Sequence, residues 1–212
     1  MVSIKQEMEE KAKRVVEKLK AHHFKAVYFK TKEEATQEIL KHVVPDQKIG
    51  FGGSQTILQL GILETLENRG QTVYYHWKPG LTPEQALETR KLEMTADLFL
   101  CSTNAVTLVG ELVNIDGIGN RVNAMTFGPA KVILVAGVNK IVKDVQEGIK
   151  RIKNIAAPLN AKRLNMEVPC AKTGKCMDCS AARRICNILV VHERRPTMTD
   201  VLVILVGEEL GY

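Results

Sequence analysis

Lys131-Val132-Ile133-Leu134-Val135-Ala136 forms a continuous apolar run after its first residue, and it is the segment most informative about the architecture. A strand with one solvated face alternates apolar and polar residues, whereas a strand covered on both faces does not. The run therefore predicts a central strand of a mostly parallel sheet with helices packed on both sides.

Strand patterns and helix patterns alternate on either side of this run. Strand-like segments lie at residues 26–29, 48–51, 72–76 and 97–101, and two further apolar segments lie at 188–191 and 201–206. Thr31 with Glu34, and Thr82 with Gln85, have the spacing of capping boxes at helix starts. This alternation predicts an α/β fold with a Rossmann-like, mostly parallel sheet.

The first 22 residues are expected to form a helical extension of a single domain that spans residues 1–212. Ile4, Met8 and Val15 lie on one face of this helix. An apolar stripe of this size needs a partner, so we expect it to pack on the sheet or on a second copy, and we expect a homo-oligomer.

A second appendage is expected between residues 157 and 186. Helical periodicity, marked by Val145 and Ile149, is expected to end before Pro158, and residues 157–186 then read as an irregular loop.

Composition narrows the functional class. The net charge is +6, but basic residues are interleaved with acidic ones along the whole chain and aromatic residues make up only 5%. RNA readers typically combine basic patches with exposed aromatics, so a nucleic-acid partner is not expected. No apolar run approaches the ~20 residues of a membrane span, and the N-terminus lacks a signal-peptide core, so we expect a cytoplasmic protein with no membrane span.

The segment from Ser102 to Val122 concentrates polar side chains and glycines directly after an expected strand. Loops at strand ends are where α/β proteins place their sites. Asp116 and Arg121 are the best candidates here for charge chemistry, although they could instead form a structural ion pair, and the segment could be two hairpin turns. The ligand-binding candidates of this segment are Ser102, Asn104, Thr107 and Asn120.

The segments that follow two further strands are expected to lie beside residues 102–122, at the same edge of the sheet. Gly52, Gly53, Ser54 and Thr56 lie between an expected strand and helix, where a phosphate or another anion could bind, unless Ser54 only caps the helix. Asn139 and Lys140 follow the central strand, and Lys140 is the expected catalytic or anion-binding cation. His76, beside Trp77 at another strand end, is the one histidine near this edge.

Four cysteines are concentrated in the irregular segment: Cys170, Cys176, Cys179 and Cys186. Thiolates at this spacing could enclose one metal ion, as zinc or as part of an iron–sulfur cluster, and stable disulfides are not expected in the cytoplasm. A redox pair and purely structural cysteines remain the alternatives.

Several of these motifs together resemble the LUD-domain (lactate utilisation protein, LutC/YkgG-like) family. The resemblance covers nearly the whole chain and is carried by residues 102–105, 114–117, 119–122, 127–129, 131–132 and 137–141, with 52–54, 157–158, the four-cysteine segment and 206–212. It implies a fold similar to the NagB/RpiA/CoA-transferase group.

The resemblance also implies a function. Family members are linked to the oxidation of L-lactate to pyruvate beside iron–sulfur oxidoreductase subunits, and this chain resembles the small subunit because it has no second ferredoxin-like cysteine set. The leading hypothesis is a subunit or accessory protein in the oxidation of L-lactate or a related 2-hydroxyacid. The alternatives are a stand-alone enzyme acting on a phosphorylated or CoA-linked molecule, such as a CoA transferase or isomerase, and a metal- or redox-responsive binding protein.

Overall fold

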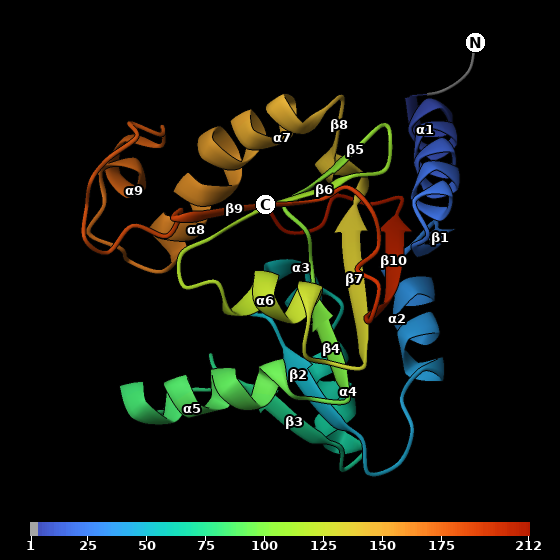
Figure 1. Ribbon diagram of the computed structural model, residues 1–212, viewed down its shortest axis with the longest axis horizontal. Helices are drawn as coiled ribbons and strands as arrows, with labels where there is room; N and C mark the ends of the chain where they lie inside the picture. Colours follow the sequence, from blue (N-terminus) through green and yellow to red (C-terminus); the bar gives the residue numbers. More distant parts are fainter. Residues whose placement is uncertain (1–3) are drawn as a thin grey trace.

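A central six-stranded parallel sheet organises the computed structural model, which describes residues 4–212 (Figure 1). The α/β class and the parallel sheet predicted from the sequence are confirmed. In spatial order the strands are β1 (Lys25–Phe29), β10 (Asp200–Val206), β7 (Lys131–Gly137), β4 (Leu98–Cys101), β2 (Lys48–Phe51) and β3 (Thr72–Tyr75).

The apolar run lies at the centre of this sheet as β7, paired in parallel with β10 and β4. Successive side chains of a strand point to opposite faces, and both faces are covered. Val132, Leu134 and Ala136 pack in one hydrophobic core, while Ile133 and Val135 pack in the other. Burial on both faces explains why the run has no polar alternation.

Each core is closed by different helices. The first contains residues of α1 (Ile4–Ala21) and α6 (Asn120–Thr126), and the second contains residues of α2 (Lys32–Lys41), α3 (Gln55–Gln59) and α4 (Ile62–Asn68). Both predicted capping boxes are present, at Thr31 of α2 and at Thr82 of α5 (Pro83–Met94). None of the helices in residues 4–212 combines the length and apolar character that a membrane crossing requires.

Helix α1 packs on its own sheet. Val15 is fully buried and Met8 packs partly against the core, as expected. Ile4 is not covered by this chain's own sheet, because it is 81% exposed in the first turn of the helix, and its burial against a second copy stays a prediction.

A smaller sheet lies beyond the carboxyl ends of the central strands, past the arrowheads of β7 and β10 in Figure 1. Its order is β8 (Ile141–Val142), β5 (Ala105–Thr107), β6 (Leu112–Asp116) and β9 (Ile188–His192). Strands β5 and β6 form an antiparallel hairpin, so part of the polar segment is indeed a hairpin. Its turn contains Gly110, however, whereas Asp116-Gly117 ends β6 and leads toward α6.

The expected helix end before Pro158 is wrong. Helix α7 (Val145–Arg151) continues through a π-helical turn (Ile152–Ala156) into α8 (Ala157–Arg163). The Ala157 N–H donates to the Ile152 carbonyl, five residues back, and this wider turn accommodates the proline ring that would clash in a regular helix. The expected irregular loop is therefore helical at α8 and again at α9 (Pro169–Thr173).

Candidate functional site

A cavity of about 220 Å³ lies at the carboxyl ends of β2, β4 and β7. The sequence predicted that the segments following these strands would converge, and the structure brings them together. The cavity is lined by Gly52, Gly53, Ser54, Thr56, Ser102, Asn104, Asp116, Asn120, Arg121 and Lys140, together with side chains that include His76, Arg90, Asn160 and Tyr212.

Lys140 lies on the wall of the cavity and is 4% exposed. Its Nζ donates hydrogen bonds to Thr56 Oγ1 at 2.8 Å and to Ser102 Oγ at 2.9 Å. Both hydroxyl hydrogens are used elsewhere, since Ser102 donates to the Thr103 carbonyl and Thr56 donates to the Leu210 carbonyl. Neither contact is to a carboxylate, and no ion pair to Lys140 occurs within residues 4–212.

The electrostatic surroundings of Lys140 are cationic. Burial lowers its pKa well below the ordinary value, and the charges of Arg151 and Arg121 lower it further. Arg151 is held by backbone oxygens of Asn139, Asn104 and Tyr212, and burial lowers its pKa as well. An anion in the cavity would therefore be favoured by a positive potential that the nearby side chains only partly neutralise.

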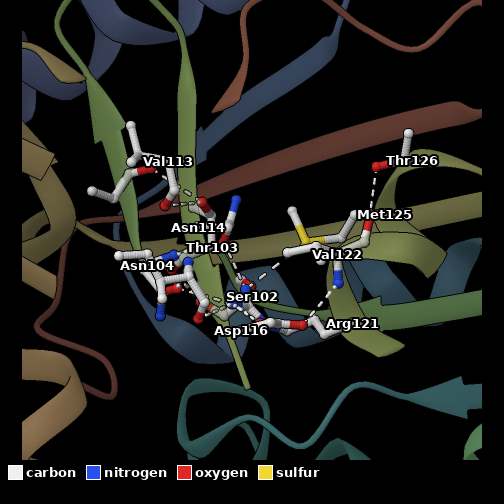
Figure 2. A network of polar contacts seen from close by, with 12 residues as sticks. Ser102, Thr103, Asn104, Val113, Asn114, Asp116, Arg121, Val122, Met125 and Thr126 are labelled. Carbon is white, nitrogen blue, oxygen red and sulfur yellow. Dashed lines mark hydrogen bonds and ion pairs between the residues drawn. The ribbon is translucent and has the colours of Figure 1, made fainter. Parts of the chain in front are cut away.

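Arg121 is the opposite case, because a dense network satisfies it (Figure 2). Its Nε and Nη2 donate to Asp116 Oδ1 at 3.0 and 2.6 Å. The remaining donors reach Asn104 Oδ1, Asn114 Oδ1 and the Ser102 carbonyl. Asp116 Oδ2 accepts the backbone N–H of Val122 in α6. The geometry is that of the structural ion pair considered as the alternative for Asp116 and Arg121, with both side chains at the edge of the cavity.

The turn after β2 has two roles in the structure. Ser54 accepts the Ile57 N–H and caps α3, which is the alternative considered for this residue. Gly53 has φ +49°, and a Cβ there would lie 2.8 Å from the Trp77 ring and 3.0 Å from His76 Nε2. Glycine at this position therefore allows β3 and its following residues to approach the cavity closely.

A buried His76–Glu93 pair forms another part of the wall. His76 Nδ1 lies 2.7 and 2.9 Å from the two carboxylate oxygens of Glu93, and the His76 backbone N–H donates to the same carboxylate at 2.8 Å. Burial raises the pKa of Glu93, and the hydrogen bond from His76 opposes the rise. The carboxylate fixes the ring, so that Nε2 is left beside Gly53 at the cavity.

The sequence analysis did not predict a role for Glu93, because this residue lies in a charged helix, where a glutamate normally faces solvent. One feature of the sequence could have indicated that α5 lies close to β2. Gly50 interrupts the buried strand β2, and a Cβ there would lie 2.8 Å from the Glu93 carbonyl oxygen. A glycine inside a strand can mark the close approach of another backbone, here that of α5.

Two predicted ligand-binding residues point elsewhere. Thr107 accepts the Glu111 N–H and donates to its carboxylate inside the β5–β6 hairpin. Asn139 Oδ1 accepts the Leu210 N–H at 3.2 Å and holds the C-terminal segment in place. Neither residue is part of the cavity lining.

The four cysteines are free thiols in and after α9. Burial raises the pKa of Cys170, and the neighbouring Cys186, Cys179 and Cys176 raise it further, so the four sulfurs are electrostatic neighbours. Within the described chain, however, no group of three or more His, Cys, Asp or Glu side chains is placed to hold a metal ion. The metal or cluster site predicted for these cysteines therefore stays a prediction.

Comparison with known proteins places the chain in a class. The LUD-domain profile matches residues 12–206, and the chain belongs to the LUD-domain family. The structure is similar to the crystal structure of a DUF162 family protein from Deinococcus radiodurans, with a TM-score of 0.53 and 14% sequence identity, over 94% of this chain and 98% of that one. At this identity the similarity supports the fold alone. No curated protein matches.

Proposed function

We propose that this LUD-domain protein is a subunit or accessory protein in the oxidation of L-lactate, or a related 2-hydroxyacid, to the 2-oxoacid, and that its cavity binds the small carboxylate. The proposal rests chiefly on Lys140. A buried amine that contacts only neutral hydroxyls, with two further arginines nearby, is suited to a ligand that supplies negative charge.

The size of the cavity supports a small ligand. Its volume of about 220 Å³ is below the range of roughly 300–1,000 Å³ that is usual for drug-sized molecules. A three-carbon carboxylate would fit in the space beside Lys140, and His76 Nε2 would be a proton acceptor on the same wall. The oxidation also needs an electron acceptor, for which we propose an iron–sulfur oxidoreductase partner.

The Gly52–Thr56 turn favours a second candidate, an enzyme acting on a phosphorylated or CoA-linked molecule. Gly53 exposes backbone in a left-handed turn, and Thr56 lies beside Lys140. Two observations weigh against it: Ser54 is engaged in capping α3, and a CoA ester would extend well outside the cavity.

Isothermal titration of the full chain with L-lactate, pyruvate, inorganic phosphate and CoA separates the candidates. We expect binding of the two carboxylates, loss of binding in Lys140→Met, and no change in Lys143→Met, which removes an exposed lysine three residues away. Binding of phosphate or CoA but of neither carboxylate would favour the second candidate.

The role in the cell has its own test. Deletion should impair growth on lactate, and the tagged protein should co-purify with an iron–sulfur partner. Normal growth without a partner would refute the role in lactate oxidation. Elemental analysis of anaerobically purified protein tests the third candidate, a metal- or redox-responsive protein using the four cysteines.

A further inference from the structure

The hydrogen bonds around Lys140 match a neutral amine. Ser102 and Thr56 both spend their hydroxyl hydrogens on backbone carbonyls, so their oxygens can only accept from Nζ. A neutral amine has two hydrogens and one lone pair, whereas a protonated amine has three hydrogens and no lone pair. Two acceptors use both hydrogens of the neutral form and leave the lone pair available at the cavity wall.

The surroundings favour the same form. Burial and the two neighbouring guanidinium groups lower the pKa of Lys140, and residues 4–212 supply no carboxylate contact that would stabilise its charge. Asp116, a carboxylate in the same cavity lining, is committed to Arg121 and to the N-terminus of α6. A desolvated lysine beside other cations is the usual environment of an amine that acts as a nucleophile.

We propose that Lys140 is a catalytic nucleophile that forms a reversible imine with the carbonyl carbon of a 2-oxoacid bound in the cavity. The inference rests on the proposed function, which supplies the 2-oxoacid. The carboxylate of that acid distinguishes it from a simple ketone, because the positive charges of Arg151 and Arg121 beside Lys140 would attract it.

The reaction is redox-neutral and needs no further reactant. The Nζ lone pair attacks the carbonyl carbon, an N–C bond forms, and the electron pair of the C=O π bond moves to oxygen. A proton passes from nitrogen to that oxygen. A second proton transfer expels the oxygen as water and leaves a C=N bond, and water reverses each step.

Reductive trapping tests the inference. The full-length protein is incubated with pyruvate and sodium cyanoborohydride near neutral pH, and the intact mass and peptide map are measured. We expect a single adduct, with the mass of pyruvate less one oxygen atom, on Lys140. Labelling should be lost in Lys140→Arg, be retained in Lys143→Arg, and be suppressed by excess L-lactate. The peptide map of the unmodified sequence identifies the lysine even if Lys140→Arg does not fold.

The remaining outcomes separate this inference from the proposed function. If calorimetry detects pyruvate but no adduct forms, the imine is refuted and the carboxylate site stands. If neither acid binds, the proposed function fails first. Labelling of Lys140 by acetone as fast as by pyruvate would overturn the assignment to 2-oxoacids, and labelling spread over surface lysines would overturn the special reactivity of Lys140.

Discussion

Arg121 and Lys140 line the same cavity, yet the two basic side chains have opposite surroundings. Arg121 is satisfied by Asp116, Asn104 and Asn114, so that little of its hydrogen-bonding capacity is left for a ligand. Lys140 has two neutral acceptors and a cationic environment. A basic group with a matched partner stabilises the wall of a site, while one without such a partner is available to a ligand.

Arg121→Met should have the largest effect, and it should be on stability. Without the guanidinium, the Asp116 carboxylate is left buried and unpaired, which typically costs about 3–5 kcal/mol. Denaturant unfolding measures the loss, with the exposed Arg183→Met as the matched control. A loss below that of the control would show that the network is not structural.

Lys140→Met should affect ligand binding more than stability. We expect the affinity for pyruvate to fall about 10–100-fold, the value of one or two hydrogen bonds to a charged group, because the amine is removed. The free energy of unfolding should not fall, since an unpaired buried amine contributes little to stability. Unchanged affinity would place the ligand elsewhere.

Glu93→Gln tests the second buried pair of the cavity. The amide keeps the size of the side chain but no longer provides a carboxylate for the His76 ring, so we expect a loss of about 1–3 kcal/mol in denaturant unfolding. Pyruvate affinity should fall less than in Lys140→Met. Glu88→Gln, on the exposed face of α5, is the matched control, and an equal effect of both would refute a special role for Glu93.

The pH dependence of stability sharpens the comparison further. The pKa of Lys140 is lower in the folded state than its ordinary value of 10.5, so the unfolded chain binds more protons between the two values. Stability should therefore rise with pH across this interval, by about 1.4 kcal/mol for each pH unit that separates the two pKa values.

The groups that face Lys140 set this interval: Arg151 of α7, Arg121 of α6 and Cys101 of β4. Lys140→Met lacks the titration, so the difference between the two unfolding curves should shrink toward pH 10.5. Parallel curves for the two proteins would contradict the lowered pKa.

The cysteine segment should have the smallest effect on the cavity. Ile185 lines the cavity but none of the four thiols does, so Cys176→Ser and Cys179→Ser should change pyruvate affinity by less than about 0.5 kcal/mol. If the predicted metal site forms, both variants should lose metal in anaerobic elemental analysis and become more sensitive to protease. Unchanged metal content and protease resistance would leave the cysteines as packing residues.

The sequence alone predicted the central sheet and the edge at which the cavity lies, because both depend on local patterns. An unbroken apolar run such as Val132–Ala136 suits a strand covered on both faces, and in a parallel sheet the carboxyl ends of such strands meet at one edge. The capping boxes at Thr31 and Thr82 were readable for the same reason, since each involves residues only three apart.

Other features of the fold and of the cavity depend on contacts between segments that are far apart in the sequence. Helix continuation through Pro158 depends on a π turn, and the role of Glu93 depends on the close approach of α5 to Gly50. The difference between Arg121 and Lys140 likewise depends on which of them lies beside Asp116. Local patterns determine which residues lie at an edge, because strand and helix periodicities are short-range. The tertiary structure determines which charges are paired, because pairing and desolvation depend on neighbours that are far apart along the chain.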